Sequence, residues 1–490
     1  MAGEIQLSNE NQKDIEIEII GDGSIGAKAK ELLEKTHLLR ELGFSTPRRV
    51  VLASGFFNEF FLRNNLGIDF ANVDITDSTT QRVIRGSFSK EQFELIKTIS
   101  ESFGDVPLVV RSSAEGDSRG TGTYNTVFVD NDLGEVNKAI RKVLSSYFTK
   151  SAKAFRKDAN TPEGMGIIIE PLIGEKIEDS LVPEYEYITP AFSGYGYTST
   201  AREGPYITIV RGLGGAVDSR DGIKITPLTL GINDVNFGYY LDQMWIDKEK
   251  RFSEDNGIHY GKIFEVNKAF RKGHLAKTQI DFLTATDNFD ISHLFSSIIK
   301  IEEQLGKPQY FEFAITSEDG QPKCWITQIA DIDIKVDTID FSESKTPLIN
   351  ADSVTGTGII ESNCIVTCIT LAQVKALEEY NKTHFGYILI YRDELISGEV
   401  RDLYYQHYSN SSVLLEVSTG IHANNPISHL SGQLDMTNKF FGIFSSDELF
   451  ELENLLKPIV NKTNGIEEYN GKFKVISSER QNRLIVCKVD

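Results

Sequence analysis

The strongest constraint on the fold comes from residues 108–129, where a polar, glycine-rich segment separates two apolar runs. The first run, Leu108-Val109-Val110, is typical of a short buried strand, and strand character resumes at Thr126. The residues between the two runs include three glycines and have almost no apolar content. We therefore expect a loop that connects two strands and begins near Arg111 and Ser112.

A loop of this composition suits the binding of a polyphosphate. The guanidinium group of Arg111 presents fork-shaped hydrogen-bond donors, and the hydroxyl of Ser112 adds a further donor. Glycine leaves neighbouring backbone N–H groups unshielded, so that they can approach an anion closely. A solvated connection between two strands explains the same composition, and the residues of this segment alone leave both interpretations open.

The composition narrows the class of protein. A chain of 490 residues is too long for a single hydrophobic core, which indicates about two to four domains. A net charge of −20, with no run of Lys or Arg, argues against a nucleic-acid or anionic-membrane partner. The N-terminal residues lack the pattern of a secretory signal, and a cysteine count of four favours the cytoplasm. We interpret Cys364 and Cys368, which lie in a strand-like context, as core residues.

A second glycine-rich segment follows the first predicted strand, residues 15–20. Its glycines at 21, 23 and 26 match the G-x-G-x-x-G spacing of dinucleotide-binding folds. That fold also needs an acidic residue at the end of the next strand, which here ends at Ser54. Another interpretation places Lys28 at the start of a helix, near an anion held by the helix N-terminus. A surface lysine is the alternative.

These segments resemble the nucleotide-binding domain of pyruvate phosphate dikinase and phosphoenolpyruvate synthase. The segment VRSSA at 110–114 and the segment GAKAKEL at 26–32 carry the resemblance, and further matches follow in the family's order. The resemblance implies an α/β (α+β) fold with an ATP-grasp-like nucleotide domain over residues 1–340, in two lobes of about 1–165 and 166–340. It also implies that Lys28, Arg111 and Ser112 bind ATP and that Arg111 takes part in catalysis.

The resemblance extends to two later segments. At the apolar strand near residue 169 it implies that Glu170 and Leu172 contact adenine, although an ordinary core strand explains these residues as well. At the predicted hairpin 309–329 it implies that Glu312 and Gln328 bind Mg²⁺, and that Gln328 also contacts the nucleotide. The chain departs from the family pattern twice in this hairpin. An expected aspartate is replaced by Tyr310, and an expected arginine is replaced by Ala330.

The tail, residues 350–490, alternates strand-like and helix-like segments, which predicts a smaller α/β domain. By resemblance this would be a divergent swivelling domain whose histidine carries a phosphoryl group. The best candidate is His429, which follows Ser428 at a predicted helix start, and His422 is the runner-up. A helix N-terminus lowers the pKa of a histidine and keeps it nucleophilic. A surface histidine is again the alternative.

Together these features predict an ATP- and Mg²⁺-dependent phosphotransferase of the dikinase type, located in the cytoplasm. It would pass a phosphoryl group through a histidine to a small-molecule or protein acceptor, with AMP and phosphate as the other products. The barrel that binds phosphoenolpyruvate or pyruvate in the full family members is absent from these residues, so the acceptor is not assigned. We expect neither nucleic acid nor a membrane as partner, and a homodimer is left open. The alternatives are an ATP-grasp ligase or direct kinase without phosphohistidine, and a degenerate ATP-binding regulator or scaffold.

Overall fold

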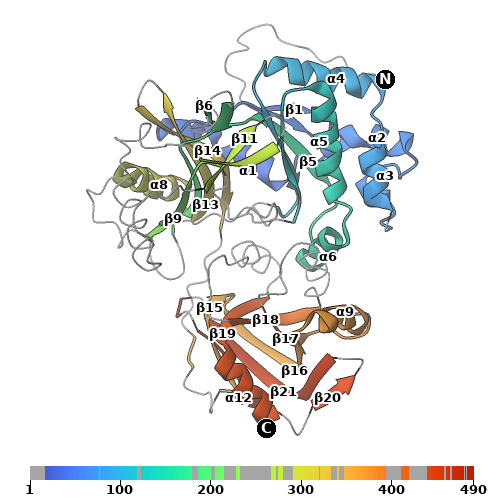
Figure 1. Ribbon diagram of the computed structural model, residues 1–490, viewed down its shortest axis with the longest axis vertical. Coiled ribbons are helices and arrows are strands. Elements are labelled where there is room, and N and C mark those ends of the chain that lie inside the picture. The colour runs from blue at the N-terminus through green and yellow to red at the C-terminus, as the bar shows by residue number, and fades with distance from the viewer. Residues whose placement is uncertain are drawn as a thin grey trace.

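The computed structural model divides into an N-terminal part that contains several sheets and a C-terminal part around one further sheet (Figure 1). The fold is mixed α/β, as predicted. The structure describes residues 17–76, 78–117, 123–178, 186–199, 205–213, 228–231, 266–271, 274–279, 291–318, 321–332, 339–341, 347–392, 410–418, 439–456, 460–463, 466–478, 480–481 and 483–489.

The first sheet has the strand order β1-β2-β5-β3-β4. Its strands are β1 (Ile17–Ile20), β2 (Arg49–Leu52), β3 (Leu108–Ala114), β4 (Thr126–Val129) and β5 (Met165–Pro171). Only the β1–β2 pair is parallel, while β5 runs antiparallel to both of its neighbours and β4 antiparallel to β3. A dinucleotide-binding fold has a parallel sheet, whereas this sheet is mixed. The glycine spacing at 21–26 therefore does not indicate a dinucleotide-binding fold here.

Strand β3 is longer than the sequence suggests. The prediction of a loop from Ser112 onwards is wrong, because β3 continues to Ala114 and pairs with β5 along its whole length. Ser112 and Ser113 are almost fully buried, and their hydroxyl groups form hydrogen bonds within the fold. Polar side chains that find such partners are tolerated inside a strand, so polarity alone did not mark the strand's end.

Several helices surround the hydrophobic core of the first sheet, which is rich in phenylalanine. They are α2 (Asn58–Arg63), α3 (Thr79–Arg85), α4 (Lys90–Ser102), α5 (Leu133–Ser146) and α6 (Lys150–Ala159). The apolar spacing of residues 89–104 predicts an amphipathic helix, and α4 confirms it. The apolar spacing of residues 133–158 likewise predicts a helix. The structure divides this region into α5 and α6, because Thr149 caps a new helix start by accepting a hydrogen bond from the Ala152 N–H.

The second sheet has the order β10-β9-β8-β13-β14, and a third has the order β12-β11-β7-β6. Their strands are β6 (Glu175–Glu178), β7 (Glu186–Thr189), β8 (Phe192–Tyr197), β9 (Tyr206–Arg211), β10 (Leu228–Gly231), β11 (Val266–Arg271), β12 (His274–Gln279), β13 (Gln309–Glu318) and β14 (Gln321–Asp331). Helix α8 (Ile291–Leu305) packs on the second sheet. The predicted hairpin at 309–329 is confirmed as the antiparallel pair β13–β14.

Helix α1 (Gly26–Glu41) connects the first two sheets. Its buried residues Ala29, Leu32 and Leu39 belong to one hydrophobic cluster with residues of both sheets, including Ile168 of β5 and Phe311 of β13. The helix therefore lies where the two sheets meet, and residues at its start are close to both.

The C-terminal sheet has the order β16-β17-β18-β19-β15-β22-β21-β20, and a further pairing of β16 with β21 closes it on itself. Its strands are β15 (Ile349–Thr355), β16 (Gly358–Cys368), β17 (Tyr387–Arg392), β18 (Ser411–Ser418), β19 (Phe440–Ser445), β20 (Val460–Thr463), β21 (Ile466–Ser478) and β22 (Arg483–Val489). Helices α9 (Leu371–Tyr380) and α12 (Ser446–Leu456) flank it (Figure 1). Cys364 and Cys368 contribute to one hydrophobic cluster of this domain, as predicted.

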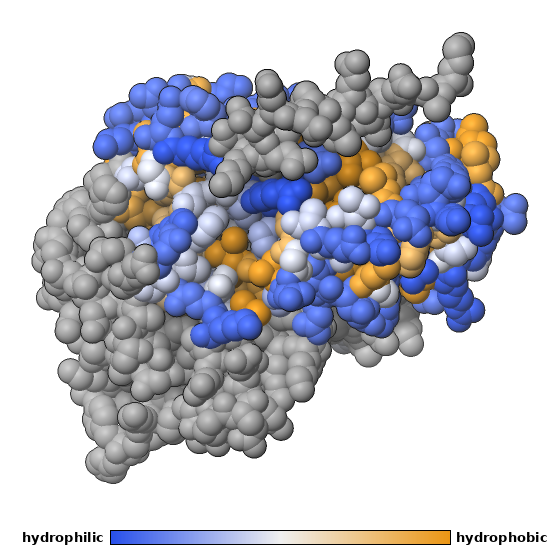
Figure 2. Space-filling view, turned by 90° about the horizontal axis from the view of Figure 1, so that it is seen from above, coloured by the Kyte–Doolittle hydropathy of each residue, from blue (hydrophilic) through white to orange (hydrophobic). Residues whose placement is uncertain are grey.

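On the face shown in Figure 2, hydrophilic residues surround smaller hydrophobic patches. Among the described residues, no helix is both long enough and apolar enough to span a membrane.

Candidate functional site

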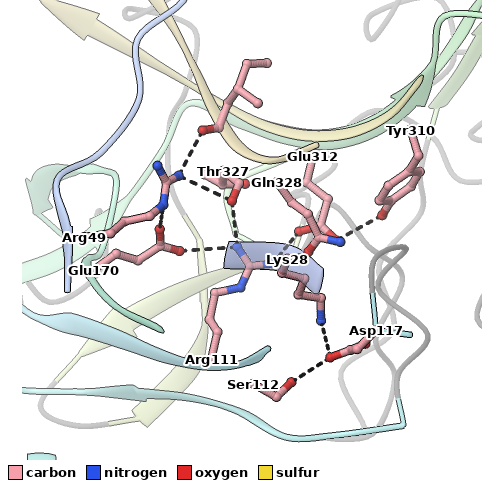
Figure 3. Close-up of polar contacts among 11 residues, drawn as sticks. Lys28, Arg49, Arg111, Ser112, Asp117, Glu170, Tyr310, Glu312, Thr327 and Gln328 are labelled. Atoms are coloured by element: carbon pink, nitrogen blue, oxygen red, sulfur yellow. Dashed lines mark hydrogen bonds and ion pairs between the residues drawn. The ribbon is translucent and has the colours of Figure 1, made fainter. Parts of the chain in front are cut away.

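A cluster of polar side chains lies where the first and second sheets face each other (Figure 3). It brings together four residues that the sequence singled out from distant segments: Lys28 of α1, Arg111 of β3, Glu312 of β13 and Gln328 of β14. The charges of Arg111 and Lys28 both act on Glu312. The residues proposed for phosphate and metal binding therefore share one site.

Arg111 is at the centre of this site. One terminal nitrogen donates to Glu312 Oε2 at 2.7 Å and to Gln328 Oε1 at 2.8 Å. The other donates to Glu170 Oε1 at 3.3 Å and to the Thr327 carbonyl oxygen at 3.1 Å. Burial alone would lower the pKa of Arg111, but the carboxylates of Glu312 and Glu170 outweigh burial and raise it. The guanidinium is charged and joins the two sheets.

The carboxylate of Glu170 forms ion pairs with two arginines, Arg49 and Arg111. Its Oε2 accepts a hydrogen bond from Arg49 Nε at 2.7 Å, while its Oε1 faces Arg111. Arg49 is fully buried, and its terminal nitrogens donate to carbonyl oxygens that include that of Ile326. Burial lowers the pKa of Arg49, although Glu170 counteracts this. The predicted contact of Glu170 with adenine stays a prediction, and the observed contacts give its carboxylate another role.

Arg49 was not among the site residues predicted from the sequence. The only signal was the presence of two arginines at the start of a predicted strand, where apolar residues are usual. Arg48, just before β2, is partly exposed, whereas Arg49 and the rest of β2 are buried. A charged residue at a buried strand position needs a counter-ion, and in the structure Glu170 supplies it.

Lys28 forms the second ion pair of the site. Its Nζ lies 2.8 Å from Asp117 Oδ2, and Ser112 Oγ donates to the same oxygen at 3.0 Å. All three side chains are buried. Asp117, just after β3, was not selected from the sequence, because acidic residues in a polar glycine-rich segment are ordinary.

Glycine at position 26 lets the start of α1 approach β3. Gly26 has a φ of +75°, and a Cβ atom added there would lie 1.6 Å from the carbonyl oxygen of Ser113. The Ala29 N–H donates to Ser113 Oγ at 3.0 Å, which fixes the first turn of α1 on the strand. This close contact is what brings Lys28 beside the end of β3.

Leu172, predicted to contact adenine, lies at the edge of the site. Its side chain is buried in a small hydrophobic cluster with Val109 and Leu213, and Phe128 and Ile188 pack against that cluster. Its backbone N–H donates to the carbonyl oxygen of Pro107 at 2.8 Å. This backbone N–H is therefore engaged within the fold, and the contact of Leu172 with adenine stays a prediction.

Glu312 and Gln328 lie directly opposite each other on β13 and β14. Burial would raise the pKa of Glu312, but the charges of Arg111 and Lys28 outweigh burial and hold it below its ordinary value. Tyr310 donates to Glu312 Oε1 at 2.9 Å, and burial raises the pKa of this tyrosine. The two residues that depart from the family pattern, Tyr310 and Ala330, are also direct cross-strand neighbours.

The site is electrically balanced. Within the described part of the chain, its ion pairs join three cations with three carboxylates: Lys28, Arg49, Arg111, Asp117, Glu170 and Glu312. A search of the described residues finds no group of three or more His, Cys, Asp or Glu side chains that could hold a metal ion. Glu312 and Gln328 offer hard oxygen donors of the kind that magnesium prefers, and their binding of this ion stays a prediction.

The two candidate phosphocarrier residues, His429 and His422, lie outside the described residues. Their proposed role is therefore not tested by the contacts above. The strands on either side of that segment, β18 and β19, pair in parallel in the C-terminal sheet.

The fold and this site define a class: a mixed α/β protein in which two sheets face each other across a buried cluster of charges. Residues 22–340, well over half of the chain, match the AMP/ATP-binding domain of pyruvate phosphate dikinase, and the chain belongs to that family. No curated protein matches the chain.

Proposed function

We propose that this chain is an ATP-dependent phosphotransferase of the dikinase type. A phosphoryl group from ATP would pass to a histidine of the C-terminal domain, His429 or else His422, and then to a small-molecule or protein acceptor. With water as co-reactant, AMP and phosphate are the other products. Membership of an AMP/ATP-binding family supports the nucleotide half of this proposal.

One observation carries the proposal: Lys28, Arg111 and Glu312, from three distant segments, share one buried site. Phosphoryl transfer depends on positioning and on cations near the phosphate oxygens more than on covalent chemistry by the protein. Lys28 and Arg111 can supply that positive charge, since each already binds a carboxylate oxygen in a geometry that suits a phosphate oxygen.

The balance of charges implies that the nucleotide must arrive with a counter-ion. A neutral cluster offers little net attraction to a triphosphate, and each cation has to leave a carboxylate in order to bind a phosphate. Magnesium would supply this counter-charge by neutralising the negative charge of the phosphates. Glu312 and Gln328 are the residues that would hold it. Glu170 and Arg49 would keep Arg111 oriented towards this point.

The test is to identify the products formed from ATP. The dikinase route predicts AMP, phosphate and an acid-labile phosphate on the protein, and this label should be lost in His429→Ala or in His422→Ala. ADP without a labelled protein would favour a direct kinase or an ATP-grasp ligase. If neither product forms, the transferase proposal is wrong.

A nucleotide-binding regulator is the second candidate. It is favoured by Tyr310 and Ala330, which stand where the family pattern has an aspartate and an arginine. Under this hypothesis ATP raises the melting temperature of the protein, because the ligand binds only the folded state, but no product accumulates.

A further inference from the structure

Two rows of side chains cross three strands of the second sheet on the face that carries Glu312. Residues two apart on a strand point to the same face, so the two rows are neighbours. The first row joins Tyr195, Glu312 and Gln328, and the second joins Tyr197, Tyr310 and Ala330. The metal-binding candidates therefore lie directly beside a row of aromatic residues.

The ring of Tyr310 is held in place from several sides. Its centroid lies 5.3 Å from that of Tyr197 and 6.1 Å from that of Tyr195, distances at which aromatic rings attract each other. On the other side the fully buried Ala330 has a side chain small enough to leave room for the ring. Packing of this kind leaves the hydroxyl group little freedom to move.

The fixed hydroxyl group orients the carboxylate of Glu312. Tyr310 donates to Oε1 at 2.9 Å, and Arg111 donates to Oε2 at 2.7 Å (Figure 3). Two donors that approach the two oxygens from different strands fix the plane of the carboxylate. Each carboxylate oxygen has two lone pairs, so each can still accept one further partner.

We propose that Tyr310 is a positioning residue that sets the Glu312 carboxylate for one divalent cation bound together with the nucleotide. This inference rests on the nucleotide binding proposed above. A phenol orients its neighbour without adding charge, and Glu312 is the single carboxylate of the two rows. One carboxylate, one amide oxygen and the phosphates of the nucleotide suit one magnesium ion.

The variant Tyr310→Phe tests the inference, because it keeps the ring and removes only the hydroxyl group. Calorimetry would measure ATP affinity with excess magnesium and again with a chelator. We expect the affinity without metal to stay within about twofold of the wild type, whereas the gain due to magnesium falls about tenfold, as for the loss of a hydrogen bond to a charged group. A general effect on folding would change both values.

The C-terminal domain supplies a matched control. Tyr391 donates to Glu416 Oε2 at 3.0 Å, which is the same type of buried hydrogen bond. Tyr391→Phe should leave ATP affinity unchanged with and without magnesium. Melting curves of both variants report whether they fold as the wild type does. A separate measurement needs no variant: electron paramagnetic resonance counts the Mn²⁺ ions bound to the wild type in the presence of ATP. One Mn²⁺ per chain is expected.

The outcomes separate the two proposals. If the wild type binds no ATP, the proposed function fails and this inference fails with it. If the wild type binds ATP with a gain from magnesium that Tyr310→Phe fully retains or increases, the positioning role is overturned while nucleotide binding stands. Two Mn²⁺ ions per chain would likewise overturn the single-cation site.

Discussion

Two of the ion pairs of the site, Lys28–Asp117 and Arg111–Glu312, differ in what they connect. Lys28 and Asp117 are 89 residues apart, and both lie beside the start of α1 and the end of β3, on the side of the first sheet. Arg111 and Glu312 are 201 residues apart and join the first sheet to the second. Both pairs are largely buried, but only the second holds two sheets together.

Because of this difference, we expect substitutions on the two sides of the site to affect ATP binding and folding stability differently. Arg111 has two carboxylates, an amide oxygen and a backbone carbonyl as partners, so its loss leaves several buried acceptors unpaired. Lys28 forms an ion pair with one carboxylate, that of Asp117, and this carboxylate also accepts a hydrogen bond from Ser112. We expect substitutions on the Arg111 side to weaken both folding and ATP binding, and substitutions on the Lys28 side to act mainly on binding.

The largest effect should come from Arg111→Met, which removes the link between the sheets. Breaking a buried pair by removing one partner costs about 3–5 kcal/mol, because the remaining carboxylates stay buried and unpaired. ATP affinity should fall at least about a hundredfold, which corresponds to about 2.7 kcal/mol. Urea denaturation and calorimetry measure the two effects.

Arg48→Met is the control for this variant, since the neighbouring arginine has a side chain that is 41% exposed and lies 3.6 Å from Glu18. An exposed pair contributes about 1 kcal/mol or less, and ATP affinity should not change. Equal stability of the Arg111 and Arg48 variants would contradict the view that Arg111 joins the sheets.

The variant Lys28→Met tests the Lys28 side of the site, where we expect an effect mainly on ATP binding. ATP affinity should fall about 10- to 100-fold, since a cation at the phosphates is lost, while stability should fall by only about 1–3 kcal/mol. Lys30→Met, two residues further along α1 and exposed, is the matched control and should behave as the wild type. A stability loss as large as that of Arg111→Met would show that the two sides of the site do not differ.

A change in the opposite direction is expected for Asp117→Asn. Under the proposed function, the carboxylate of Asp117, which pairs with Lys28, would compete with a phosphate oxygen for this lysine and would repel the phosphate. A neutral side chain of the same shape should therefore tighten ATP binding by about fivefold, on the order of 1 kcal/mol. Asp105→Asn, at an exposed position, serves as control in the same titration. Weaker binding in Asp117→Asn would mean that this carboxylate supports the ligand.

The same comparison shows what the sequence could predict. Lys28, Arg111, Glu312 and Gln328 were selected because each lies in a segment with a local pattern, such as a helix start or a hairpin. Some strands and helices, such as β1, the β13–β14 hairpin and α4, followed from local patterns in the same way. These four residues come from separate segments, and the structure brings them together in one site.

The counter-ions of the buried charged residues could not be predicted from local sequence patterns. Arg49 and Glu170 are 121 residues apart, and nothing local to either position names its partner. Asp117 depends on the close approach of α1 to β3, which a single glycine, Gly26, permits. The continuation of β3 through two serines was missed for the same reason, because the burial of a polar residue depends on partners elsewhere in the fold.

The smallest effect should be the pH dependence contributed by Glu312. Its pKa in the folded protein is lowered, mainly by Arg111 acting against burial, while in the unfolded chain it is about 4.3. A lowered pKa adds stability that is complete above the unfolded value and is lost as the pH falls through the folded value. Wild type and Glu312→Gln should therefore differ most in urea midpoint near pH 7, and this difference should narrow below about pH 4. A difference that stays constant between these conditions would mean that Arg111 does not hold Glu312 ionised, and the link between the two sheets would then need another explanation.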